Sequence, residues 1–135
     1  MKNCKINWLQ LIFTSVIPLI AWMLFIFLLS HREKVAFTEN YAISFSIFKS
    51  LHIAEYAILF LLWLRFFHLV KIKSKYFLAL ILTFVYGLSD EFHQSFIFGR
   101  EGKLLDACVD GLGGLIAWLF IKKNQILKKI VFKTR

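Results

Sequence analysis

Apolar positions along the chain fall into four long runs that are separated by short polar connections. The runs cover about residues 8–30, 46–67, 76–92 and 104–121. The first run has 23 residues without a charge, which is enough for a helix to cross the hydrocarbon core of a bilayer. The pattern therefore predicts an all-α integral membrane protein with four transmembrane helices, and the short connections favour an up-down bundle.

Composition supports one membrane domain over residues 1–135. Hydrophobic residues make up 59% of the chain, more than a soluble domain of this size could bury. The first run is too long for the apolar part of a signal peptide, and no small-residue cleavage pattern follows it. Pro18 lies within this run, where neighbouring helices must satisfy the carbonyl that a proline leaves unpaired.

Basic residues predict the orientation of the helices. Twelve of the 17 Lys and Arg residues lie in the N-terminal segment, the second connection with its border and the C-terminal tail. The positive-inside rule places these three regions, and hence both termini, in the cytoplasm. The same distribution accounts for the net charge of +9, because it suits a protein whose partner is the lipid bilayer. It argues against a nucleic acid as the partner.

Ionisable side chains gather in the outer halves of the last three predicted helices. A helix rises about 1.5 Å per residue, which places these groups roughly 5–13 Å below the outer boundary. Asp106 and Asp110 are four residues apart, and the small residues Gly114 and Ala117 extend their stripe, so both carboxylates should face the bundle interior. The others are Lys49, His52 and Glu55 on the second helix and Asp90 on the third.

Two interpretations of this cluster remain open. An ionised side chain at the bilayer centre costs about 2.5–3.5 kcal/mol on insertion scales, so a functional pocket is the default hypothesis. The alternative is a non-enzymatic scaffold, in which Lys49 and Arg100 balance the acids and hold the helices together.

Specific motifs occur in the same part of the chain. They are Lys-x-x-His-x-x-x-Tyr, then Asp-Glu-x-His-Gln, then Gly-Arg and an Asp that opens the last helix. In combination they resemble the VanZ-like family of small bacterial membrane proteins. Asp110 departs from the Asn that this family often has there, and Phe98 from a Pro. The matching residues are Lys49, His52, Tyr56, Asp90, Glu91, His93, Gln94, Gly99, Arg100 and Asp106.

The resemblance implies a context and leaves the reaction open. It implies the bacterial cytoplasmic membrane and a link to low-level resistance to the glycopeptide teicoplanin. As an enzyme, the protein would act on a lipid or lipid-linked envelope precursor, with His52 or His93 as general acid or base. Asp90, Glu91 and Asp106 would orient the imidazoles or bind a divalent cation. The residues expected to bind the ligand are Lys49, Glu55, Tyr56, Gln94, Arg100 and Asp110.

The same residues could instead bind a lipid, a glycopeptide or a partner membrane protein without turnover. A transporter is disfavoured, because four helices make a narrow pathway and their inner halves lack ionisable groups. No complete metal-ligand motif is present, so a metal site is not predicted, and the cofactor and oligomeric state stay open.

Overall fold

The computed structural model describes residues 8–31, 41–97 and 104–133, and every regular element in these ranges is a helix. The first apolar run forms one continuous rod, in which a π-helical turn joins two α-helical parts. The elements are α1 (Trp8–Leu11), the π-helix η1 (Ile12–Val16), α2 (Ile17–Ser30), α3 (Tyr41–Leu69), α4 (Lys75–Gln94), α5 (Leu104–Lys123) and α6 (Gln125–Val131).

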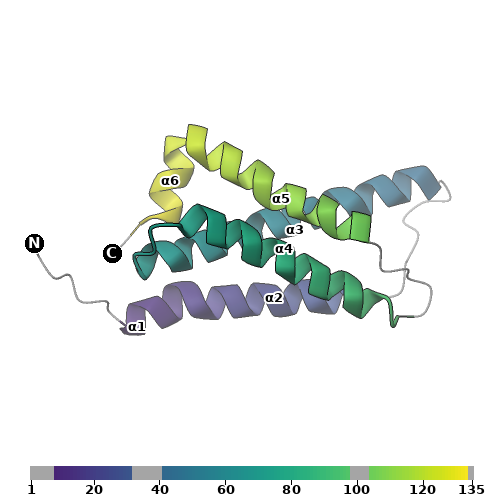
Figure 1. Ribbon diagram of the computed structural model, residues 1–135, viewed down its shortest axis with the longest axis horizontal. Coiled ribbons are helices and arrows are strands. Elements are labelled where there is room, and N and C mark those ends of the chain that lie inside the picture. Colours follow the sequence, from purple (N-terminus) through teal and green to yellow (C-terminus); the bar gives the residue numbers. More distant parts are fainter. Residues whose placement is uncertain (1–7, 32–40, 98–103, 134–135) are drawn as a thin grey trace, which may run out of the picture.

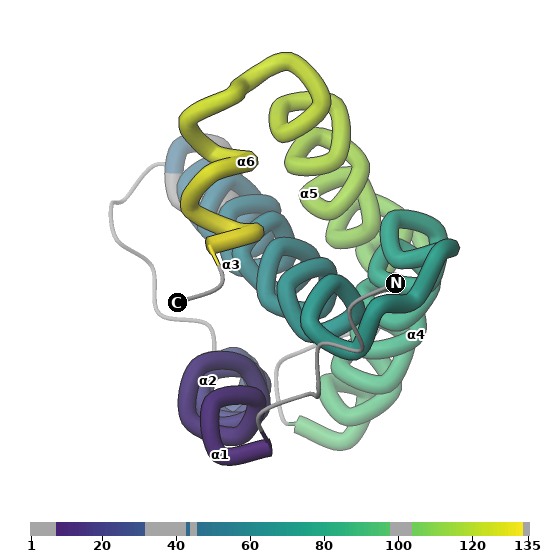
Figure 2. The backbone as a smooth tube through the Cα atoms, turned by 90° about the vertical axis from the view of Figure 1, so that its left-hand side faces the viewer, coloured from purple at the N-terminus to yellow at the C-terminus, as the bar shows by residue number. Residues whose placement is uncertain are grey.

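The long helices alternate in direction, as the up-down prediction requires (Figure 1). The rod from α1 to α2, then α3, α4 and α5 run back and forth along the longest axis, and α6 folds back at the end where the described chain also begins. Viewed from that end, α4 and α5 lie beside each other on one side of α3, and α2 lies apart from α5 (Figure 2). α3 packs against all three of these helices, and α5 also packs against α4.

Three of these elements are long and apolar enough to cross a membrane. They are Trp8–Ser30, Ser46–Leu69 and Leu104–Lys123. α4 is not among them, because its last turns carry Asp90, Glu91 and other polar residues and shorten its apolar part. The structure therefore establishes a multi-pass, all-helical membrane protein with three candidate spans in its described part, where the sequence predicts four.

Pro18 is accommodated as the sequence predicts. A proline lacks the N–H that would pair with the carbonyl four residues earlier, here that of Thr14. Arg65 of α3 donates from Nε to the Thr14 oxygen at 3.0 Å. Its Nη1 also donates to the carbonyls of Ile130 and Val131 at the end of α6, at 3.2 and 3.3 Å. One guanidinium thus links three elements.

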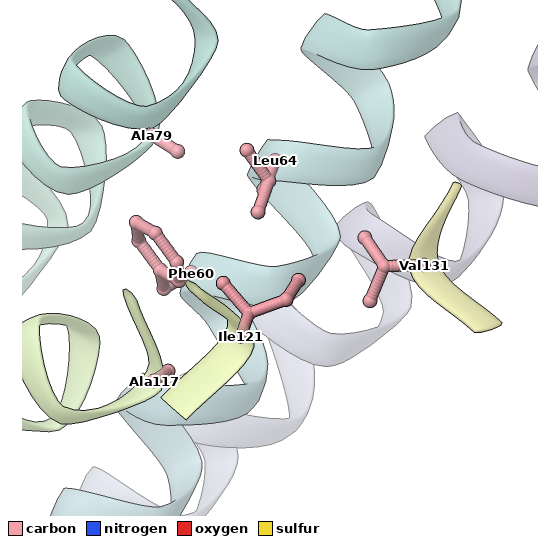
Figure 3. Close-up of a cluster of buried hydrophobic side chains, with 6 residues drawn as sticks. All are labelled: Phe60, Leu64, Ala79, Ala117, Ile121 and Val131. Carbon is pink, nitrogen blue, oxygen red and sulfur yellow. The ribbon is translucent and has the colours of Figure 1, made fainter. Parts of the chain in front are cut away.

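Apolar packing closes the bundle near α6 (Figure 3). The small side chains of Ala79 and Ala117 let α4 and α5 approach α3, and bulky residues fill the space between them. Large apolar side chains elsewhere point outward, such as Leu105, which is 76% exposed, as expected for a surface in contact with lipid. The buried cluster comprises Phe60, Leu64, Ala79, Ala117, Ile121 and Val131.

A glycine sets the distance between α3 and α5. A Cβ added at Gly113 would overlap the backbone carbonyl oxygen of Ile53, so the two helices touch through their backbones at this level. Such contact is typical of small residues at helix interfaces in membranes. It holds α3 and α5 together next to the level at which most of the candidate site residues lie.

Candidate functional site

Asp90 is the centre of a buried hydrogen-bond network between α2, α3 and α4. Its side chain accepts at Oδ2 from Ser30 Oγ at 2.7 Å, from Gln94 Nε2 at 2.9 Å and from Tyr56 O–H at 3.3 Å. Asp90 is only 3% exposed. Buried carboxylates are retained where donors converge on them, and here three helices supply those donors.

One ion pair and one contact between an imidazole and a carboxylate lie on the α3 side of the site. Lys49 Nζ is 2.7 Å from Asp106 Oδ1 and joins α3 to α5, with both side chains partly exposed. His52 Nδ1 is 3.1 Å from Glu55 Oε2, one turn along the same helix. Trp22 of α2 donates to the backbone carbonyl of Glu55 at 3.0 Å and fixes this turn of α3 against α2.

Asp110 is fully buried at the junction of α3, α4 and α5. A Cβ added at Gly87 would lie 3.6 Å from the Cβ of Asp110 and 3.3 Å from the ring of Tyr56, so all three pack closely. Neither carboxyl oxygen of Asp110 has a hydrogen-bond partner among the described residues, and the same holds for Oδ1 of Asp90. The electrostatic neighbours of Asp110 are His52, Glu91, Lys49 and Asp90.

His93 lies toward α2. Its Nε2 is 3.2 Å from Nδ1 of His31, and its ring packs against Phe27 with centroids 4.5 Å apart. A hydrogen bond between two imidazoles needs one neutral acceptor nitrogen, so the pair holds at most one extra proton without losing this bond. His93 therefore lies at the edge of the site, next to the end of the first rod.

The structure brings most of the sequence-predicted residues together, with His93 at the edge of the site. Glu91 is buried beside Asp90 on α4. Arg100 lies outside the described residues. No group of three or more His, Cys, Asp or Glu side chains in the described ranges could hold a metal ion. The residues now placed around one junction are Lys49, His52, Glu55, Tyr56, Asp90, Glu91, Gln94, Asp106 and Asp110.

Sequence reasoning missed the contribution of the first rod. Ser30 is fully buried on Asp90, and His31 contacts His93. The signal was the Ser-His pair that directly follows the apolar run, at the same end of the bundle as the other polar groups. Taken alone, this Ser-His pair indicates only the end of a helix.

The arrangement offers acid-base and ion-binding chemistry. A carboxylate beside an imidazole, as in Glu55 and His52, can orient the ring and stabilise its protonated form. The partly exposed Lys49 and Asp106 offer one charge of each sign to a polar head group. The buried carboxyl of Asp110 offers two acceptor oxygens deeper in the bundle.

Comparison with known proteins identifies relatives at the family level. The family model described as VanZ/LLP1 matches residues 13–128, which is most of the chain and includes every candidate site residue. Searches of the curated proteins and of the solved structures gave no match.

Proposed function

Because the chain belongs to the VanZ/LLP1 family, we propose that it is a multi-pass protein of the bacterial cytoplasmic membrane that binds a lipid or lipid-linked envelope precursor. The ligand's head group enters the polar cluster in the outer half of the bundle. A glycopeptide phenotype, in particular a change in teicoplanin susceptibility, follows from altered handling of such a precursor.

The unpaired buried carboxyl of Asp110 carries this proposal. A cluster that serves only as a scaffold should satisfy its buried polar atoms, because each unsatisfied one costs about 1–3 kcal/mol. Asp90 Oδ2 fits that expectation with three donors. Both oxygens of the fully buried Asp110 and Oδ1 of Asp90 lack a hydrogen-bond partner in the described part of the chain. This favours a ligand-binding site over a purely structural network.

Turnover is the second candidate function, and the proximity of His52 to Glu55 favours it. With Nδ1 directed at Glu55, the other ring nitrogen is the one left to exchange a proton with a ligand. In the enzyme reading His52 is the general acid or base, and Lys49 and Arg100 hold an anionic head group. Lys49 is already paired with Asp106, so an anion would compete for it.

We further propose that α4 is the fourth crossing and that both termini are cytoplasmic. α4 runs antiparallel to α3 and α5 and packs against both, and both are candidate spans. One end of the bundle carries Lys71, Lys73 and the lysines at residues 122, 123, 128 and 129, which the positive-inside rule places in the cytoplasm.

Reporter fusions test this topology. A green fluorescent protein at the C-terminus should fluoresce, and alkaline phosphatase there should be inactive, because both report a cytoplasmic location. Phosphatase fused after Lys103 should be active. If α4 does not cross, the N- and C-termini will lie on opposite sides, and an N-terminal tag labelled from outside the cell would overturn the four-span topology.

Replacement of His52 by glutamine tests the site. Glutamine keeps a polar group near Glu55 but cannot act as a base, so the chain should still insert while its effect on teicoplanin susceptibility is lost. If the reaction is enzymatic, the rate should fall by about 100-fold, as removal of a general acid or base typically causes. The assay measures teicoplanin inhibition of a host without its own copy, together with melting in detergent.

The matched control is Ser50→Ala, on the same helix at an exposed position. This variant should behave like the wild type in both measurements. Full activity of His52→Gln, combined with a large loss of melting temperature, would instead support the scaffold interpretation.

A further inference from the structure

We propose that the group received at the centre of the site is a primary ammonium, bound by Asp110 and the free oxygen of Asp90. This inference rests on the proposed function, since it names the chemical class of the same ligand. Amine-bearing lipids such as phosphatidylethanolamine carry this group. The sequence pattern alone, in contrast, points to the cations of the site and therefore favours an anionic ligand.

Charge counting around the junction indicates a cationic ligand. Five carboxyl groups lie in the cluster: Glu55, Asp90, Glu91, Asp106 and Asp110. The cations that the described residues supply are Lys49, His52 when protonated, and one proton shared by the His31–His93 pair. Counted over the described residues alone, the carboxyls therefore outnumber the cations, and at least one carboxyl lacks a counter-charge from these ranges.

Pairing identifies Asp110 as that carboxyl. Asp106 is neutralised by Lys49 at 2.7 Å, and Glu55 lies 3.1 Å from His52, which balances its charge when the imidazole is protonated. Asp90 accepts three hydrogen bonds at one oxygen. Asp110 has neither a hydrogen bond nor an ion pair in the described ranges, although it is completely buried. A buried carboxylate without a partner is unfavourable, and a donor with a positive charge relieves this most effectively.

Packing favours a small cation. Gly87 lies close to both Asp110 and the ring of Tyr56, and the backbones of α3 and α5 meet at Gly113. An ammonium is compact and has three donors, which matches the three unpartnered oxygens of Asp110 and Asp90.

The rest of the head group fits the outer part of the site. Lys49 and Asp106 are partly exposed and lie one helical turn, about 6 Å, from the level of Asp110 along α5. A phosphate at Lys49 and an ammonium at Asp110 can be joined by a short amino-alcohol linker. The site is thus complementary to a zwitterionic aminophospholipid, with its acyl chains in the bilayer beside the bundle.

Native mass spectrometry of the detergent-solubilised full chain tests this inference. The probes are phosphatidylethanolamine, phosphatidylcholine with its methylated nitrogen, and phosphatidylglycerol without nitrogen, all with the same acyl chains. The wild type should bind phosphatidylethanolamine about tenfold or more tightly than either other lipid, because only its ammonium donates to the carboxyl oxygens. Asp110→Asn should abolish this preference, whereas Cys108→Ala, at an exposed position on α5, should keep it.

The outcomes distinguish a failure of the ammonium assignment from a failure of the proposed lipid site. Tighter binding of phosphatidylglycerol, or a preference that survives in Asp110→Asn, overturns the ammonium assignment while a lipid site remains. Equal, weak binding of all three lipids by wild type and variants overturns both. If the Asp110→Asn variant does not accumulate in the membrane, the relative affinities of the wild type for the three lipids still test the assignment. Displacement by soluble glycerophosphoethanolamine would support the assignment and identify a water-soluble amine as the source.

Discussion

Replacing Arg65 with methionine is expected to lower the stability of the protein in detergent by about 2–4 kcal/mol, although Arg65 lies far from the candidate site. Methionine keeps most of the apolar stem of the side chain but removes all donors. The Thr14 carbonyl, which Pro18 cannot pair, would then lose the donor at 3.0 Å, and the end of α6 would lose its link to α3. Unfolding by titrated denaturing detergent, followed by far-UV circular dichroism, measures the loss.

Pro18→Ala tests whether loss of the contact to the Thr14 carbonyl causes this destabilisation. Alanine restores an N–H four residues after Thr14, so the carbonyl can pair within its own helix. In this background Arg65→Met should cost clearly less than it costs in the wild type, because only the contacts to α6 remain to be lost. An equal cost in both backgrounds would show that the Thr14 contact contributes nothing measurable.

Gly113→Ala is expected to have the other large effect, a loss of about 3 kcal/mol or more, at the upper end of the range for overpacked interiors. The added methyl group would overlap the Ile53 carbonyl oxygen on α3. A backbone atom cannot rotate aside, so α3 and α5 must separate. Because Lys49–Asp106 bridges the same two helices near their N-terminal ends, the variant should also lose the proposed lipid binding. Melting in detergent and native mass spectrometry report the two effects.

Gly114→Ala is the control for this substitution. Its Cβ would meet the side chains of Leu80, Thr83 and Phe60 at 3.3–3.5 Å, and these atoms can shift by a few tenths of an ångström. We expect a loss of about 1 kcal/mol or less for this neighbour. If Gly113→Ala is as mild as Gly114→Ala, the backbone contact between α3 and α5 is looser than described, and the junction around Asp110 has more room.

The sequence alone identified the membrane class, the family resemblance and the residues of the polar cluster. Run length and hydrophobicity decide whether a helix can cross a bilayer, and both are local properties. Helical spacing places residues on a common face, which is why Asp106 and Asp110 were expected to point inward together, and the rise per residue gives only a predicted depth for Asp90. The need of the Thr14 carbonyl for a donor outside its helix likewise followed from Pro18.

Only the tertiary structure decided which charges are paired. Lys49 was a candidate partner for several acids, and it pairs with Asp106 because the contact at Gly113 fixes how α5 lies on α3. Ser30 and Arg65 acquired their roles through partners 60 and 51 residues away in the chain. Periodicity gives the face and depth of a residue on its own helix, whereas pairing depends on the rotation and shift of one helix against another. That is why the unpaired state of Asp110, on which the proposed ligand depends, appears only in the folded bundle.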